Sequence, residues 1–126
     1  MKLNGQTPMS QDQVPFDENA VGSSFVDPGK LPWQVSDAPG FDTITLFENR
    51  LTGESTVLMK VAPGAFADVH SHELLEEIYV LEGEFADQTR RYAKGQYCIR
   101  AAGAPHTATS ESGCVILLVY RLPKNY

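Results

Sequence analysis

The sequence predicts an all-β fold in which short strands form one sandwich or barrel. From position 41 onward, runs rich in β-branched and aromatic residues alternate with turns of glycine, proline and polar residues. No stretch between these runs repeats its apolar residues with helical periodicity. The chain has 126 residues, of which 42% are hydrophobic, so it can build one core and has little material for a second. We therefore expect a single domain.

The N-terminal part of the chain differs in composition from the rest. Residues 1–22 mix Gln, Asp, Asn, Pro and Gly with scattered apolar residues and show no period. We expect them to form a flexible arm, and residues 23–126 to form the folded domain. Several prolines surround Trp33. Because proline lacks the N–H that a central strand donates, we expect Trp33 to lie in a short strand at a sheet edge.

The strands of the domain can be placed by their flanking turns. Two β-rich runs, 41–50 and 54–62, are separated by a short Gly-containing loop, which is typical of a hairpin. We expect four further strands within residues 77–87, 95–102, 105–110 and 114–122.

The last of these runs, CVILLVYRL, is apolar on both alternating faces. Such a strand must be covered on both sides, either within the domain or by a second copy of the chain. We expect a homodimer, with Trp33, Tyr79 and Val119 near its contacts.

Charge and hydropathy exclude several classes of partner. The formal net charge of -6 opposes binding to nucleic acid and to anionic membranes. No apolar run reaches the length of a membrane span, and the start of the chain lacks the apolar core of a signal peptide. We expect a cytoplasmic protein. Cys98 and Cys114 lie in apolar runs, where thiols usually act as small buried hydrophobes, so a disulfide is disfavoured.

The stretch DVHSHELLEEIYVLEG, residues 68–83, contains two histidines followed by several glutamates. In an extended chain His70, His72 and Glu76 have the same parity, so their side chains can face one side of the strand. Glu77 would then face away. The turn after His72 can break this count, so parity alone does not decide between the two glutamates.

The spacing of this stretch resembles the first cupin motif, Gly-x5-His-x-His-x3-Glu-x6-Gly, at every position from Gly64 to Gly83. The motif selects Glu76. A second stretch, GQYCIRAAGAPHTATS, resembles the second cupin motif, Gly-x5-Pro-x-Gly-x2-His-x3-Asn. It departs from that motif by an alanine at 101 and a serine at 110, and it retains His106 at the metal-ligand position.

The resemblance implies a cupin-type jelly-roll β-barrel, also called a double-stranded β-helix. It also implies that a divalent transition metal is bound by His70, His72, Glu76 and His106. All three histidines of the chain fall on these positions. The nitrogen and oxygen donors would accept iron(II) or zinc, and also manganese or nickel.

A narrower resemblance lies in LEEIYVLEGEFAD, YAKGQYCIR and HTATSESGCVILLVYR. These segments are similar to the cupin sensor domain of ChrR-type anti-sigma factors and to iron-dependent dioxygenases that cleave small diketones or hydroxyacetophenones. ChrR-type proteins carry a separate N-terminal zinc domain with His and Cys ligands. Because no His precedes His70 and no Cys precedes Cys98, we expect that sigma-binding half to be absent.

Two functions are therefore open. The first is an iron(II)-type dioxygenase, or a related metal-dependent lyase or isomerase, in which Glu76 tunes the ion and accepts a proton from a small oxygenated substrate. The second is a sensor or regulatory module in which zinc stabilises the barrel. A storage or structural protein that retains the site is a third, weaker reading.

Other side chains have two interpretations each. Arg100 could orient an anionic substrate at the barrel mouth or form a surface salt bridge. Glu73 and Glu77 are either solvated charges or partners that fix a histidine tautomer. Four further side chains are expected either to line a pocket or to pack in the core: Met59, Phe66, Tyr97 and Tyr120.

Overall fold

The computed structural model describes residues 22–124, and contacts along the chain divide it into two units, residues 1–32 and 33–126. The predicted flexible arm, residues 1–22, lies outside the described part except for Gly22. Each unit is described by itself.

The described part of the first unit contains one 3-10 turn, η1 (Pro28–Lys30). Asp27 precedes the turn and caps it, because its Oδ1 accepts a 3.0 Å hydrogen bond from the amide of Gly29. Proline at the first position of the turn needs no amide partner, so the local sequence suits this geometry.

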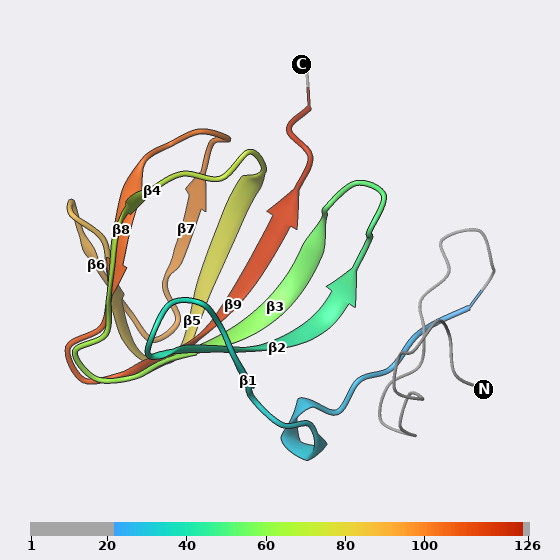
Figure 1. Ribbon diagram of the computed structural model, residues 1–126, viewed down its shortest axis with the longest axis horizontal. Helices are drawn as coiled ribbons and strands as arrows, with labels where there is room; N and C mark the ends of the chain where they lie inside the picture. Colours follow the sequence, from blue (N-terminus) through green and yellow to red (C-terminus); the bar gives the residue numbers. More distant parts are fainter. Residues whose placement is uncertain (1–21, 125–126) are drawn as a thin grey trace. The chain divides into compact units, whose positions relative to one another are not determined.

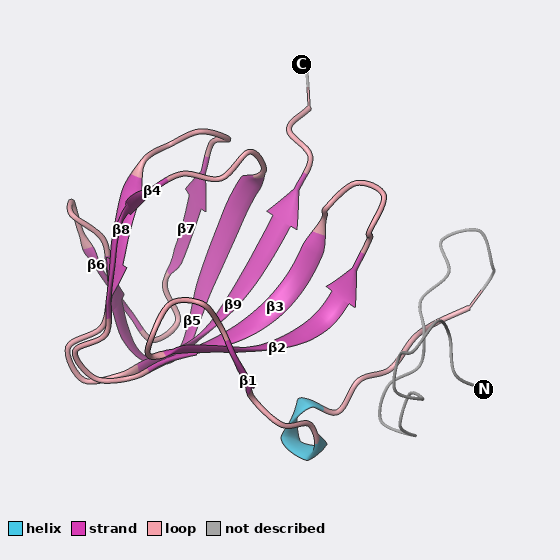
Figure 2. Cartoon of the chain, viewed as in Figure 1, coloured by secondary structure: helices cyan, strands magenta, loops and turns pink. Residues whose placement is uncertain are grey.

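The second unit is built from antiparallel β-strands, and no α-helix occurs between residues 33 and 124 (Figure 2). The all-β prediction is confirmed. The strands are β1 (Gln34–Val35), β2 (Phe41–Glu48), β3 (Ser55–Val61), β4 (Phe66–His70), β5 (Leu75–Ala86), β6 (Arg91–Ala93), β7 (Tyr97–Arg100), β8 (His106–Thr109) and β9 (Cys114–Arg121).

The strands hydrogen-bond in the order β1, β2, β3, β9, β5, β8, β4, and β6 and β7 pair with β5 beside this path. Figure 1 shows the sheet curling from β2 and β3 through β9 and β5 toward β8 and β4, which is the arrangement of the predicted jelly-roll barrel. The long strand β5 joins the two walls, because it pairs with four others, β6, β7, β8 and β9.

The predicted hairpin is present, and the predicted short edge strand begins one residue after Trp33 and does not include it. β2 and β3 pair in antiparallel register, and Gly53 in their loop has a φ of 81°, a conformation that glycine adopts without strain. β1 pairs only with β2 and so lies at the edge of the sheet, directly after Trp33. The Lys60 ammonium lies 4.9 Å from the centre of the Trp33 ring, within cation–π range.

The interior of the curled sheet holds the hydrophobic core. Alternate residues of β5 are buried, namely Glu76, Ile78 and Val80, as expected for a strand with one face inward. In β9 the alternation is the same, and Ile116 and Leu118 are almost fully buried. The two cysteines are free thiols, half-buried at 98 and buried at 114, in agreement with the sequence prediction.

The outer face of the sheet also carries apolar residues. One row crosses five paired strands, and its members are Ile44, Leu58, Leu117, Tyr79 and Tyr97. The two tyrosines at its end are exposed. The homodimer expected through this region stays a prediction. Within residues 22–124 no helix has the length and hydropathy needed to cross a membrane.

The close approach of Gly83 in β5 to Gly113, the residue before β9, gives the first prediction. Gly83 has a φ of 75°, and a Cβ there would lie 2.1 Å from the carbonyl oxygen of Gly113. Gly64 has a similar φ of 81° and open space around it. Gly83→Ala should lower the free energy of unfolding by more than about 3 kcal/mol, because it adds a steric clash to the strained backbone conformation. Gly64→Ala should lower it by about 1 kcal/mol, because only the backbone conformation is strained there. Urea unfolding measures both, and equal losses would contradict the steric argument.

Candidate metal centre

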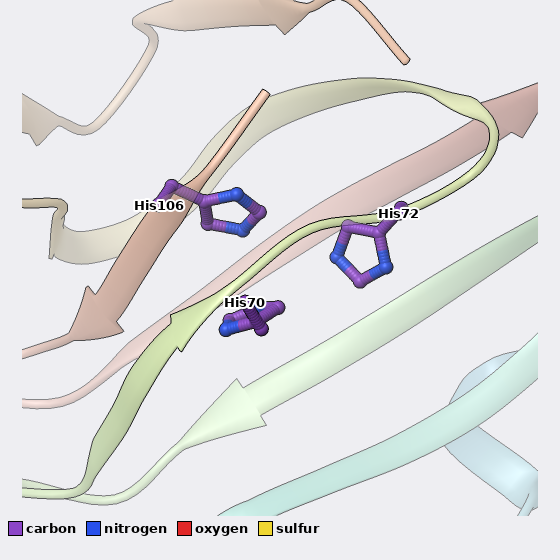
Figure 3. Close-up of side chains that lie close together, drawn as sticks. All are labelled: His70, His72 and His106. Carbon is purple, nitrogen blue, oxygen red and sulfur yellow. The ribbon is translucent and has the colours of Figure 1, made fainter. Parts of the chain in front are cut away.

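Three histidines come together where β4 ends and β8 begins. His70 closes β4 and is the register partner of His106, the first residue of β8. His72 follows in the loop that leads to β5. One nitrogen from each ring lies within 4.8 Å of those of the other two, and Figure 3 shows the three rings gathered around one space. Antiparallel pairing thus joins the two sequence motifs in one site.

Backbone carbonyls select the tautomer of two of these rings. Nδ1 of His70 lies 2.7 Å from the carbonyl oxygen of Asp68, and Nδ1 of His106 lies 3.4 Å from that of Ala104. A carbonyl oxygen can only accept a hydrogen bond, so each Nδ1 carries the proton. Nε2 of each ring is then left with a free lone pair, which is the form that binds a metal ion.

Glu76 lies against this cluster, as the motif predicts. Its Oε2 is 3.3 Å from Nε2 of His72, and its Oε1 is 3.6 Å from Nε2 of His106. The Glu76 side chain is only 4% exposed, and among residues 22–124 its Oε1 has no hydrogen-bond partner. Arg100 Nε lies 3.3 Å from this oxygen without the alignment of a hydrogen bond, so a cation among the histidines would complete its contacts.

The neighbouring glutamates do not enter the site. Glu77 points to the outer face, where it accepts a hydrogen bond from the hydroxyl of Tyr97 and pairs with Arg121 at 2.9 Å. Glu73 is exposed. The parity expectation, in which Glu76 faces inward and Glu77 outward, agrees with this arrangement.

Burial favours the neutral form of two of the three rings. Burial lowers the pKa of His72 and of His106, and this effect exceeds the opposing attraction of the Glu76 carboxylate. Both imidazoles are therefore neutral near pH 7 and able to ligate. The donor set fits a divalent transition metal ion: three imidazole nitrogens and one carboxylate oxygen would leave a net charge of about +1 at the ion.

A cavity of about 130 Å³ opens directly beside these donors. Its wall is mostly apolar, and Ala67 of β4 and Ala108 of β8, which are register partners, both contribute. The other lining residues, besides the three histidines and Glu76, are Ser36, Ala38, Phe41, Met59, Ile78, Phe85, Ile116, Leu118 and Tyr120.

Of the four side chains expected at a pocket or in the core, two are found there. Met59 and Tyr120 line the cavity, whereas Phe66 and Tyr97 are at least half exposed on the surface, with exposed fractions of 60% and 50%. The expectation for these two was wrong. Burial, and then the nearby Glu76 carboxylate, raise the pKa of Tyr120 above its usual range, so its hydroxyl keeps its proton.

The structure agrees with neither interpretation of Arg100. Its side chain is 12% exposed and does not line the cavity, so it neither meets a substrate nor sits at the surface. It forms an internal ion pair with Glu76 and with Asp87, whose side chain is fully buried. No sequence pattern singled out Asp87, because it lies in a turn after β5 and outside both histidine motifs.

Comparisons with known proteins agree with this fold. A family profile described as the ChrR Cupin-like domain matches residues 21–123. A search of curated protein sequences gives no match. Among solved structures, the complex of SigE with the anti-sigma ChrR from Rhodobacter sphaeroides aligns with a TM-score of 0.63 and 25% identity, over 72% of this chain and 50% of the matched one. The chain therefore spans half the length of that protein.

Two further structures align over most of both chains. KdgF from Halomonas sp. has a TM-score of 0.66 and 24% identity, over 82% of this chain and 97% of its own. A Methylibium petroleiphilum protein provisionally described as an acetylacetone dioxygenase has a TM-score of 0.73 and 14% identity, over 83% and 81%. At these identities the two alignments establish the fold.

The Asp87 ion pair gives a prediction on pH. Burial raises the pKa of Asp87, but hydrogen bonds from Thr89, Arg100 and Tyr92 together outweigh it and hold the pKa well below its usual range. The folded protein therefore binds this proton more weakly than the unfolded chain. The charged Asp87 therefore stabilises the folded state fully above the pKa of about 4 that it has in the unfolded chain. This stabilisation is lost as the pH falls toward the pKa of Asp87 in the folded protein.

Asp87→Asn should lower the free energy of unfolding by about 3 kcal/mol at pH 7 and by less at pH 3. Urea unfolding at the two pH values measures this, with the exposed Asp37→Asn as the control. An equal loss at both values would contradict the assignment of a charged Asp87.

Proposed function

The chain belongs to the ChrR Cupin-like domain family, and we propose that it binds one divalent transition metal ion through His70, His72, Glu76 and His106. The close approach of the three ring nitrogens and the unsatisfied Glu76 oxygen support this ligand set. With iron(II) in this site, the protein acts as a dioxygenase on a small oxygenated molecule such as a diketone or hydroxyketone.

The observation that carries this function is the apolar cavity against the histidines. Its volume of about 130 Å³ is well below the roughly 300–1,000 Å³ of pockets for drug-sized ligands, so only a small molecule fits. Apart from Glu76 and the histidines, no side chain in the lining carries a charge. A compact substrate would therefore direct its oxygens to the ion and its carbon atoms to the apolar wall.

A bound divalent ion supplies Lewis acidity and, when it is iron(II), electrons for oxygen. The protein supplies the rest. The apolar wall excludes bulk water from the reacting group. The Tyr120 hydroxyl, which stays protonated, can donate a hydrogen bond to a substrate oxygen. Glu76 is the group placed to accept a proton from the substrate.

A sensor module is the second candidate function. It is favoured by the match to the ChrR Cupin-like domain and by the 25% identity to the ChrR complex, in which the anti-sigma protein is bound to SigE. In this function four protein ligands complete a tetrahedral zinc site. Metal binding would then contribute to folding, and no substrate would be turned over.

Metal content tests the site itself. Purified protein should contain one divalent transition metal ion per chain, and His70→Ala with His106→Ala should lose nearly all of it, because two of the four donors are removed. Elemental analysis after buffer exchange measures both. Glu73→Ala is the control, since this side chain is exposed and close to the site in sequence. Full metal occupancy in the double variant would refute the assignment.

A variant that fills the cavity distinguishes the dioxygenase from the sensor module. Ala108→Leu should fill it and reduce iron-dependent oxygen uptake by at least tenfold, while the metal content stays near one per chain. Ala102→Leu, at an exposed position, should keep wild-type uptake. An oxygen electrode with a panel of diketones and hydroxyketones gives the readout. Tightly held zinc and no uptake with iron-loaded wild type would favour the sensor instead.

A further inference from the structure

A buried group of charged side chains lies behind the histidines on the inner side of β5. Glu76 of β5 is the register partner of Arg100 in β7, and the guanidinium Nε lies 3.3 Å from Glu76 Oε1. On its other side the guanidinium reaches Asp87, with a distance of 2.8 Å to Oδ2. One arginine therefore connects two buried carboxylates.

Asp87 is held firmly by its surroundings. Its Oδ1 accepts hydrogen bonds from the amide and hydroxyl of Thr89, at 2.8 and 2.7 Å, and from the amide of Arg90 at 2.8 Å. Its Oδ2 accepts one of 2.9 Å from the hydroxyl of Tyr92, beside the bond from Arg100. With both oxygens satisfied, Asp87 is a fixed anchor for the guanidinium.

Glu76 is held differently. Its Oε1 faces Arg100 Nε, but among residues 22–124 neither atom has a hydrogen bond that meets normal geometry. The contact is therefore an electrostatic one with a misaligned N–H. The other oxygen, Oε2, lies toward His72 at 3.3 Å. Oε1 thus lies between Arg100 and His106, at 3.3 and 3.6 Å, while Oε2 lies toward His72, so the guanidinium competes with a metal ion for one of the two oxygens.

The structure assigns Arg100 as a positioning residue that, anchored by Asp87, restrains Glu76 to donate one oxygen to the metal ion and moderates the affinity of the site. The inference rests on the proposed metal site. The charges support it: two carboxylates and one guanidinium sum to −1, so a divalent ion would bring the buried group to +1. Removing the arginine would strengthen the attraction between the group and a divalent ion.

Replacing Arg100 by methionine removes the charge and keeps an unbranched, apolar side chain. Glu76 would then have the metal ion as its only cationic partner, and both oxygens could approach it. We expect Co(II) affinity to rise about tenfold, and the visible absorption of bound Co(II) to weaken as the coordination number rises. Arg100→Lys keeps the charge and should stay within about threefold of the wild-type affinity.

Arg121→Met is the matched control. Arg121 pairs with Glu77, the neighbour of Glu76, but on the outer face of the sheet. Its loss should leave both the affinity and the spectrum unchanged, because no charge near the histidines is altered. The measurements are competition titration of the full-length apoprotein with Co(II) and its visible spectrum.

Loss of Arg100 leaves Asp87 without a cation, so the single variant can fail to fold. The double variant Arg100→Met with Asp87→Asn removes one charge of each sign, so the sum stays at −1. It should still show the weaker absorption, because Glu76 has lost its cationic neighbour, with a smaller rise in affinity than in Arg100→Met alone. For folded Arg100→Met and the folded double variant, a Co(II) affinity no higher than that of the wild type, or a spectrum like that of the wild type, overturns the inference while the metal site stands. If the wild type binds no Co(II), the proposed metal site fails, and the inference with it.

Discussion

The register of β5 against its two neighbours is the constraint on which the core and the site both depend. It places Glu76 between Arg100 of β7 and Tyr120 of β9, facing the interior. A slip of one residue would turn Glu77 inward and move every core side chain of the strand to the outside. Glu77 would also leave Arg121, its partner on the outer face. The native register pairs Glu76 with Arg100 and Glu77 with Arg121, and a slipped register would lose both pairings.

The site introduces polar groups into an apolar barrel, and the surrounding structure reduces the cost of burying them. Two rings are oriented by backbone carbonyl oxygens two residues before them in the chain. The carboxylate of Asp87 takes hydrogen bonds from a turn that follows β5, so one buried charge is satisfied locally. Among residues 22–124, three buried side-chain atoms lack a hydrogen-bond partner: Glu76 Oε1, Arg100 Nε and Glu84 Oε2. The first two face each other beside the histidines, where a metal ion is proposed to bind.

The parts of the site that could be predicted are those encoded by short spacing in the sequence. One residue separates His70 from His72. The two motifs identify Glu76 and His106 as their partners without any knowledge of the rest of the chain. The role of Arg100 could not be found this way, because its partner Asp87 lies 13 residues away beyond a turn. For Tyr97 a signal was present: in a strand it has the opposite parity to Arg100, so an inward arginine requires an outward tyrosine.

The facing alanines of β4 and β8 bear on how such a protein can change over evolution. Ala67 and Ala108 are register partners and both line the cavity. Neither donates a side-chain atom to the histidine cluster. Larger side chains at these two positions would reduce the volume of the cavity while the strand pairing and the histidines stay in place. If the cavity binds a ligand as proposed, its size can therefore diverge in evolution through two positions without loss of the histidine cluster.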